Sequence, residues 1–357
     1  MPAYRLTADC ILNSFRSTNK RHLILTGSRG SGKTTLIKQL FGDETPSVTT
    51  WAEQGRAVYL KDSMSGETAQ IGAFDPESVG EENRMSLVEE GFYCLGIPAI
   101  ERLIQCESEW VTVDEIGYLE TGCEAYMDAV RALFEKKRVA AVVRKQDIPF
   151  LNELTARDDA FAVDLDAPFG NIGCVIMASG LGKRFGANKL MADFCGSPMI
   201  CRILDATEGI FSQRVVVTRH EEVAELCKAR GIDTVLHDLP YRSDTVRLGL
   251  EAMPLVDRCM FAASDQPLLS RETIASLAMA SENCPDFIWR TCWEGTPGTP
   301  AVFPKWAFEE LFDLPEGKGG GAVIKKYPER IRTVSVRDMY ELKDVDTYED
   351  MTNLLER

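Results

Sequence analysis

The segment Cys174-Val-Ile-Met-Ala-Ser-Gly-Leu-Gly-Lys-Arg-Phe-Gly-Ala-Asn-Lys189 decides the fold of the second half of the chain. It opens with the apolar residues 175–178, which predict a buried strand. Three glycines and three cations follow: Gly180, Gly182, Gly186, Lys183, Arg184 and Lys189. Glycines permit positive φ and leave peptide N–H groups free to face an anion, and the cations would neutralise a polyphosphate. Because open α/β sheets bind nucleotides where a strand feeds such a loop, we predict a nucleotide-binding α/β domain here.

The two best-known phosphate-loop patterns do not fit this segment, but one of them is complete near the N-terminus. The apolar run 22–26 predicts a strand, residues 27–35 read Gly-Ser-Arg-Gly-Ser-Gly-Lys-Thr-Thr, and residues 36–41 predict a helix ended by Gly42. The string matches G-x-x-x-x-G-K-[ST] between a strand and a helix. The loop N–H groups and the helix N-terminus would hold the β- and γ-phosphates, Lys33 would bridge them and Thr34 would ligate Mg²⁺. The predicted nucleotide-binding residues are Gly27, Gly30, Gly32, Lys33, Thr34 and Thr35.

A P-loop fold also needs an acidic residue at the end of a second strand. The segment Trp110-Val-Thr-Val-Asp-Glu-Ile-Gly supplies it. We expect Asp114 to hold Mg²⁺ and Glu115 to orient the attacking water. The alternatives are a strand that ends in a solvated acidic turn and a chance match in the glycine-rich turn.

Alternating strand and helix patterns predict the fold class, an α/β protein of two domains. Helical spacing between residues 119 and 137 is followed by the strand pattern 139–143, which favours a mostly parallel sheet with helices on both faces. The polar segment 164–171 contains Pro168 and Gly170, so we place the boundary there, with domains 1–167 and 168–357. The second domain restarts the pattern with strand candidates 173–178, 214–218, 234–237 and 259–263, and with a helix face of Val223, Leu226 and Cys227.

Composition limits the classes of partner. The chain of 357 residues is 45% hydrophobic and 27% charged, typical of a globular protein. It has no apolar run near the roughly 20 residues of a membrane helix and no apolar signal core, so we expect a cytoplasmic protein without a membrane partner. A net charge of −15 argues against nucleic acid. The eleven cysteines, Cys174 and Cys259 among them, are expected to be reduced structural thiols, and the three histidines show no zinc spacing.

The first half resembles the small P-loop nucleoside-triphosphatases of the thermostable NTPase family, over roughly residues 20 to 165. The resemblance lies in G-S-R-G-S-G-K-T-T-L, in E-G-F-Y at residues 90–93 and in V-D-E-I-G-Y-L-E at residues 113–120. It implies hydrolysis of a nucleoside triphosphate, ATP or GTP, with loose base preference. It also implies a hairpin region at residues 45–75.

The second half resembles the MobA-like nucleotidyltransferases, most closely the molybdenum cofactor cytidylyltransferases. Their fingerprint is a strand followed by L-A-x-G-x-x-x-R-x-G-x-x-K, which corresponds to the opening segment. Four further blocks follow in the same order as in the family: Y-R-S-D-T-V-R-L-G-L from Tyr241, S-D-Q-P-L from Ser264, G-T-P-A-V-F-P from Gly298 and D-V-D-T-Y-E-D from Asp344.

These blocks predict how the second domain acts on a nucleotide. Backbone groups of residues 180–186 would hold the triphosphate while Arg184 screens its charge, and Lys189 would meet the α-phosphate as charge develops. Asp265 and Asp346 would together coordinate Mg²⁺, which suits carboxylate and phosphate oxygens. The nucleotide-binding set is Ser179, Gly180, Gly182, Gly186, Ser243 and Arg247.

Each of these residues also has a purely structural interpretation. Asp265 could cap a helix that begins near Pro267, and Asp346 could cap the C-terminal helix. Arg247 could be a solvated helix residue, and Lys189 a surface lysine. In the family, Ala at the position of Ser179 goes with cytosine and Gly with guanine, so serine leaves the base open. Gln266 favours CTP.

The sequence therefore predicts Mg²⁺-dependent transfer of CMP from CTP to the phosphate of molybdopterin, with release of pyrophosphate, fused to an NTP-hydrolysing domain. Two alternatives stay open. The acceptor could be a sugar phosphate or polyol phosphate instead. The chain could also be an NTP-driven switch or carrier that delivers molybdenum cofactor to a molybdenum hydroxylase apo-enzyme.

Overall fold

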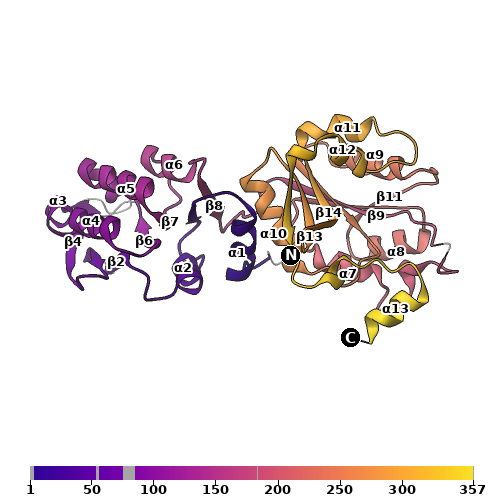
Figure 1. Ribbon diagram of the computed structural model, residues 1–357, viewed down its shortest axis with the longest axis horizontal. Helices are drawn as coiled ribbons and strands as arrows, with labels where there is room; N and C mark the ends of the chain where they lie inside the picture. Colours follow the sequence, from indigo (N-terminus) through magenta and orange to yellow (C-terminus); the bar gives the residue numbers. More distant parts are fainter. Residues whose placement is uncertain (1–3, 54–55, 75–84, 183, 357) are drawn as a thin grey trace. The chain divides into compact units, whose positions relative to one another are not determined.

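The computed structural model describes residues 4–53, 56–74, 85–182 and 184–356 of the chain (Figure 1). Lys183, one of the three cations expected in the second loop, lies outside the described residues. The chain forms two compact units. One comprises Thr7–Pro168, and the other comprises Phe169–Arg357 together with the N-terminal residues up to Leu6.

The first unit is built on an eight-stranded sheet. Its order is β5 (Met85–Leu87), β4 (Thr68–Phe74), β3 (Ala57–Asp62), β2 (Ser47–Glu53), β6 (Trp110–Ile116), β7 (Arg138–Val143), β1 (His22–Thr26) and β8 (Ala160–Asp164). The five strands from β2 to β8 are parallel, as the alternating pattern predicted. The strands β3, β4 and β5 extend the sheet by antiparallel pairing, where the family resemblance implied a hairpin region.

Helices cover both faces of this sheet (Figure 1). They are α1 (Ala8–Ser17), α2 (Lys33–Phe41), α3 (Glu89–Gly91), α4 (Ile97–Gln105), α5 (Glu124–Lys136) and α6 (Pro149–Thr155). The predicted P-loop helix is confirmed as α2, and Gly42 ends it with its N–H donating to the Lys38 carbonyl. The apolar spacing of α5 places Tyr126, Val130, Leu133 and Phe134 in the same hydrophobic core as parts of α4 and α6.

The second unit is built on a seven-stranded sheet. Its order is β11 (Asp233–Leu236), β10 (Gln213–Thr218), β9 (Ile172–Ala178), β12 (Arg258–Ala263), β14 (Thr296–Pro304), β13 (Ile288–Trp293) and β15 (Ile331–Ser335). The four strands from β11 to β12 are parallel. They correspond to the four strands expected from the sequence, and Cys174 and Cys259 are buried within them.

The helices of the second unit lie in the connections between its strands, except α13, which follows the last strand, β15. They are α7 (Ile200–Ala206), α8 (Glu221–Ala229), α9 (Arg242–Glu251), α10 (Arg271–Asn283), α11 (Phe308–Phe312), α12 (Gly321–Lys326) and α13 (Tyr348–Leu355). The predicted helix face of Val223, Leu226 and Cys227 lies on α8. Among the residues that the structure describes, no helix has both the length and the apolar character to cross a lipid bilayer.

Candidate functional site

The carboxyl ends of parallel strands gather the candidate residues of the second unit at one edge of its sheet. In register, Ala178 of β9 pairs with Thr218 of β10, and Met177 of β9 pairs with Ala263 of β12. The residues that follow these strands therefore leave the sheet side by side. They include Ser179 at the start of the glycine-rich loop, and Asp265 two residues after β12.

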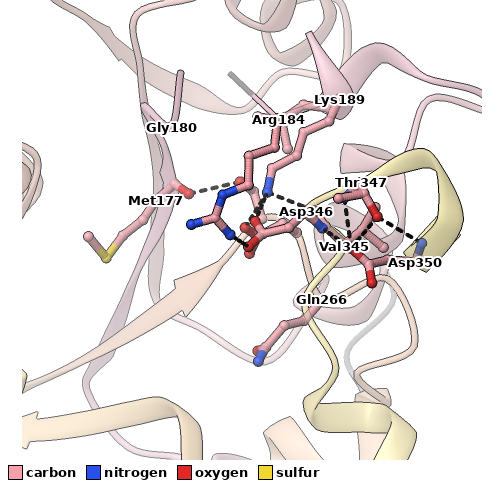
Figure 2. Close-up of polar contacts among 12 residues, drawn as sticks. Met177, Gly180, Arg184, Lys189, Gln266, Val345, Asp346, Thr347 and Asp350 are labelled. Atoms are coloured by element: carbon pink, nitrogen blue, oxygen red, sulfur yellow. Dashed lines mark hydrogen bonds and ion pairs between the residues drawn. The ribbon is translucent and has the colours of Figure 1, made fainter. Parts of the chain in front are cut away.

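Lys189 lies at the centre of this edge and joins three segments of the chain (Figure 2). Its ammonium group donates to Asp265 Oδ2 at 2.8 Å, to the Val345 carbonyl at 2.7 Å and to Asp346 Oδ1 at 3.1 Å. Burial by itself lowers the pKa of Lys189, but the carboxylates of Asp265 and Asp346 outweigh it and the net shift is upward. Only 7% of the residue is exposed, so its interpretation as a surface lysine is wrong.

Arg184 contacts the same carboxylate from the outside. Its Nη1 donates to Asp346 Oδ2 at 3.0 Å, and the side chain is mostly exposed (Figure 2). The ring of Phe185 stacks on that of Tyr348, with centroids 4.0 Å apart. Two ion pairs thus join the glycine-rich loop to Asp346, and one aromatic contact joins it to Tyr348, the first residue of α13.

The two carboxylates do not cap helices. The helix after Asp265 begins only at Arg271, and the Ser270 hydroxyl caps it by accepting from Thr273 N at 3.1 Å. The N-cap of α13 is Thr347, in a capping box with Asp350, rather than Asp346. Both capping interpretations are therefore wrong.

The arrangement suits a divalent cation that is completed by the substrate. Asp265 and Asp346 already converge on one cationic group, and Mg²⁺ is commonly held by one or two carboxylates together with substrate phosphates. Among the described residues no group of three or more histidine, cysteine or acidic side chains is placed to hold a metal ion. Phosphate oxygens and water would have to supply the remaining ligands.

Sequence reasoning missed a third carboxylate, Asp344, at this site. Desolvation and the negative charge of Asp265 raise the pKa of Asp344, and a hydrogen bond with Gln266 acts in the opposite direction. The signal was present in the D-V-D string, whose first aspartate precedes Asp346 by two residues.

The glycines of the loop differ in their roles. Gly182 and Gly186 have φ of 56° and 78°, the left-handed region that favours glycine, whereas Gly180 does not use this freedom. A Cβ atom on Gly182 would lie 2.9 Å from the carbonyl oxygen of Ala187, so a side chain there would displace the loop. Gly182 therefore allows the loop to turn back on itself ahead of Lys189.

Two histidines, which the sequence placed outside the motif blocks, lie against the start of this loop. His237 Nε2 is 2.7 Å from Ser179 Oγ, which also donates to the Val217 carbonyl at 3.1 Å. His220 Nε2 is 2.9 Å from the Gly180 carbonyl oxygen. Burial lowers the pKa of His237. Each histidine follows a strand of the same parallel set within two residues, and that position was the signal that could have found them.

Within the described residues, Ser243 and Arg247 of α9 share no hydrogen bond or ion pair with Lys189. Ser243 is buried in the first turn of α9, and Arg247 Nη2 donates to Asp244 Oδ1 at 2.8 Å with 43% of its side chain exposed. This placement agrees with the solvated-helix interpretation of Arg247. The assignment of both residues to nucleotide binding stays a prediction.

The first unit carries its glycine-rich loop between β1 and α2. Gly27, Gly30 and Gly32 all have positive φ, at 139°, 80° and 95°. Lys33 is buried, and its ammonium group donates to the carbonyl oxygens of Gly27 at 2.9 Å and of Ser28 at 2.8 Å. The three glycines therefore have the left-handed backbone that this loop pattern requires, and the Lys33 side chain folds back onto the loop.

The predicted metal ligands of this unit touch each other. Thr34 Oγ1 donates to Asp114 Oδ1 at 3.2 Å, so the residue after Lys33 meets the strand β6. Burial raises the pKa of Asp114, and the Thr34 hydroxyl opposes this shift. A hydroxyl and a carboxylate are oxygen donors that fit Mg²⁺. Thr35, which follows them, is exposed.

Glu115, the candidate that would orient water, pairs with a residue that sequence reasoning did not consider. Arg144 Nε donates to Glu115 Oε1 at 2.6 Å. Nearby, the buried Glu120 accepts from Gly117 N at 2.8 Å. Burial raises the pKa of Glu120 to about 7, while that N–H lowers it. Glu120 thereby fixes the turn that directly follows Glu115 and Ile116.

Comparisons with known proteins assign each unit to a class. Residues 22–168 match the family model described as NTPase, and residues 174–331 match the model described as MobA-like NTP transferase domain. The chain joins an NTPase domain to a nucleotidyltransferase domain. Both resemblances drawn from the sequence are confirmed at this level.

Individual relatives cover one domain each. The nucleoside-triphosphatase THEP1 of Thermotoga sp. (strain RQ2) is 29% identical over 158 residues, which are 40% of this chain and 86% of that protein. The 3-deoxy-manno-octulosonate cytidylyltransferase of Acinetobacter baumannii is 31% identical over 96 residues, 24% of this chain and 38% of that enzyme. The solved structure of Rv0371c from Mycobacterium tuberculosis H37Rv has a TM-score of 0.47 at 23% identity, covering 52% of this chain and 99% of that one.

Proposed function

We propose that the second unit transfers CMP from CTP to the terminal phosphate of molybdopterin and releases pyrophosphate. The observation that carries the transfer step is the ammonium group of Lys189 held between Asp265 and Asp346 beside a glycine-rich loop. The choice of molybdopterin and of CTP is supported by the five motif blocks that resemble the molybdenum cofactor cytidylyltransferases.

The reaction is an in-line displacement at phosphorus. An oxygen of the acceptor phosphate bonds to the α-phosphorus of CTP, and the bond from that phosphorus to the α,β-bridging oxygen breaks. The electron pair of that bond leaves with pyrophosphate. A Mg²⁺ ion held by Asp265 and Asp346 would neutralise charge on the phosphates.

The residues of this chain have separate tasks in that step. Lys189 is buried and positively charged, so it stabilises the negative charge that develops on the α-phosphate. Arg184 is exposed at the rim of the loop, where it screens the outer phosphates. The backbone of residues 180–186 orients the triphosphate, which lowers the entropic part of the barrier.

Lys189 has to exchange partners during this cycle. Its ammonium group lies between the carboxylates of Asp265 and Asp346, the two groups proposed to hold Mg²⁺. Binding of CTP with its metal would free the ammonium group to meet the α-phosphate.

The purified full-length chain tests this proposal with pyrophosphate release as the readout. Molybdopterin is offered with CTP, GTP, ATP or UTP in the presence of Mg²⁺. Release with CTP and molybdopterin, and formation of the cytosine dinucleotide seen by mass, is the expected result. Absence of release from molybdopterin with every nucleotide would end the proposal.

A second acceptor class is favoured by one comparison. The Acinetobacter relative is by its name a cytidylyltransferase of 3-deoxy-manno-octulosonate, a sugar acid, although this chain matches only 38% of it. The same assay therefore includes sugar acids, sugar phosphates and polyol phosphates as acceptors. Pyrophosphate release with CTP and one of these, but not with molybdopterin, would replace the first acceptor by the second.

For the first unit we propose hydrolysis of ATP or GTP to the diphosphate. The loop lysine, the Thr34–Asp114 contact and Glu115 support it. Delivery of the finished cofactor to a molybdenum hydroxylase apo-enzyme is the alternative role for this hydrolysis that the sequence leaves open. If delivery is the role, phosphate release rises when such an apo-enzyme is added to the full-length protein.

A further inference from the structure

Arg144 lies at the carboxyl edge of the first unit's sheet, between the glycine-rich loop and the acidic residues Asp114 and Glu115. The strand β7 lies between β1, which feeds the glycine-rich loop, and β6, which ends in Asp114 and Glu115. Arg144 follows β7 directly, and its N–H donates to the Ile116 carbonyl at 2.9 Å, which prolongs the pairing with β6. Its side chain therefore starts between the loop and the acidic pair.

The guanidinium group forms an ion pair through one nitrogen, and its central carbon lies over the Tyr118 ring, 5.8 Å from the ring centroid. Nε donates to Glu115 Oε1 at 2.6 Å, and 41% of the Arg144 side chain and 32% of the Glu115 side chain are exposed. Within the described residues, Nη1 and Nη2 of Arg144 have no hydrogen bond or ion pair. Two donors of a planar fork are thus free beside Glu115, and such a fork matches the oxygen atoms of a phosphate group.

The surroundings leave room for a ligand and position the arginine for it. Arg144 lines a cavity of about 300 Å³ together with Thr26, the last residue before the loop. A Cβ atom on Gly117 would lie 2.9 Å from Arg144 Cδ, so the glycine makes space for the aliphatic part of the side chain. The cavity touches β1 at Thr26, and its other lining residues lie between Arg144 and Thr155, after β7.

Two other cations of this edge are already engaged, whereas Arg29 in the glycine-rich loop is exposed and has no hydrogen bond or ion pair among the described residues. Lys33 donates to the carbonyl oxygens of Gly27 and Ser28, and Lys145 is paired with Asp164 at 2.7 Å and Asp166 at 3.1 Å. Among the described residues Arg144 forms an ion pair with Glu115, and its charge also acts on the buried Glu120, whose pKa it lowers. A terminal phosphate that approaches Glu115 would otherwise meet a carboxylate, and Arg144 is placed to offset that repulsion.

We propose that Arg144 is a catalytic residue of NTP hydrolysis in the first unit and that its free Nη atoms contact the γ-phosphate. The inference rests on the proposed hydrolytic function. The oxygen of water bonds to the γ-phosphorus, and the bond to the β,γ-bridging oxygen breaks with its electron pair retained by the diphosphate. The proton of the water passes through Glu115 to the released phosphate. Arg144 neutralises charge on the γ-phosphate oxygens while its Nε keeps Glu115 oriented.

The test compares Arg144→Gln and Arg144→Lys with wild type in the full-length chain, by phosphate release from ATP and GTP. An arginine that contacts the transferred phosphate contributes about 10³-fold or more to kcat. We expect Arg144→Gln to lose about 10³-fold in kcat with KM changed less than about threefold. Lysine keeps the charge but not the fork, so we expect Arg144→Lys to recover only part of the loss. Arg131→Gln, which removes an arginine paired with Glu153 and Asp128 on α5, serves as the matched control.

A double-mutant cycle separates contact with phosphate from support of Glu115. If Arg144 acts only through Glu115, Arg144→Gln has no further effect in a Glu115→Gln background. The proposal expects a further loss of at least about tenfold there. It also expects Arg144→Gln to abolish tight binding of ADP with aluminium fluoride while fluorescent ADP binds as in wild type. A thermal melt of each variant checks that the first unit is folded.

The outcomes distinguish the two levels of the argument. If wild type hydrolyses NTP and Arg144→Gln, folded by its melt, hydrolyses equally well, the inference about Arg144 is overturned and the hydrolytic function stands. If the cycle shows no further loss and aluminium fluoride still binds, Arg144 is a positioning residue and the contact with phosphate is overturned. If wild type releases no phosphate from any NTP, both the hydrolytic function and the inference fall.

Discussion

The two glycine-rich loops of this chain, residues 27–34 and residues 180–189, use the same components in different ways. Each follows the first strand of a parallel set and carries a buried lysine. Lys33 turns back on its own loop and donates to carbonyl oxygens five and six residues away. Lys189 reaches across the fold to Asp265 and Asp346, 76 and 157 residues away. The first loop is organised locally, and the second only by the tertiary structure.

This difference explains why the two loops are recognised differently in a sequence. A locally organised loop keeps its chemistry in one short string, so the string G-x-x-x-x-G-K-[ST] suffices. A loop whose lysine is held by distant carboxylates requires those carboxylates as well. The separate blocks around Asp265 and Asp346 therefore carried as much information as the glycines did.

Removing the charge of Lys189 tests the loop that is organised by distant carboxylates, and it has the largest expected effect. In Lys189→Met the α-phosphate loses its buried cation, so we expect nucleotidyl transfer to fall by about 10²–10³-fold in kcat. Phosphate release by the first unit should not change. Lys228→Met, which alters an exposed lysine on α8, is the control. Nucleotidyl transfer at the wild-type rate by Lys189→Met would contradict a role of Lys189 in the transfer step.

Removing Lys33 tests the first loop, which is organised by contacts within itself. We expect Lys33→Ala to lower phosphate release by about 10²-fold, because the β- and γ-phosphates lose their bridging cation. Pyrophosphate release by the second unit should be retained, and delivery of cofactor to an apo-enzyme should fail if the first unit is a delivery switch. Lys38→Ala, on the exposed side of α2, controls for loss of charge near the loop. Loss of transfer in Lys33→Ala would show that the two loops depend on each other.

The pH dependence of the first unit tests how strongly its local site depends on Glu120. The folded-state pKa of Glu120 is about 7 against a usual 4.5, so the native state binds more protons than the unfolded state between these values. Stability from this group is full below about pH 4.5 and is lost as pH rises to about 7. Glu120→Gln should remove that slope and gain on the order of 1–3 kcal/mol at pH 8. Denaturant melts of both proteins from pH 4 to pH 8 measure it, and equal slopes would contradict the assignment.

Changing Ser179 has the smallest expected effect and sharpens the description of the second loop. In the related family, Ala at this position goes with cytosine and Gly with guanine. We therefore expect Ser179→Ala to raise, and Ser179→Gly to lower, the ratio of kcat/KM for CTP over GTP by up to about tenfold. Steady-state pyrophosphate release with each nucleotide measures the ratio. If both variants keep the wild-type ratio, base selection lies elsewhere.

Much of the fold was predictable because it depends on local patterns. The runs at β1, β6 and β9 are apolar and short, and each ends in glycine or acidic residues that mark the carboxyl edge of a parallel sheet. Local pattern did not identify the residue that caps α13. Asp346 and Thr347 are both good N-cap residues, and the structure gives the cap to Thr347.

The residues that sequence reasoning missed are those whose role depends on strand order. His220 and His237 lie outside every motif block, yet they contact the loop because β10 and β11 are the next strands after β9 in the sheet. Arg144 reaches Glu115 for the same reason, since β7 lies beside β6. Strand order is not written in any single stretch of sequence, because it depends on how non-local hydrophobic faces pack.

The sequence by itself determined that this chain has two α/β domains, that both have a glycine-rich loop after a strand, and that the second has the blocks of a nucleotidyltransferase. These features rest on short-range spacing, glycine conformation and hydrophobic period. Only the tertiary structure decided which charges meet: Lys189 with Asp265 and Asp346, and Arg144 with Glu115. The physical reason is that an ion pair depends on a distance of a few ångströms between atoms, and the folded sheets, rather than the spacing along the chain, set that distance.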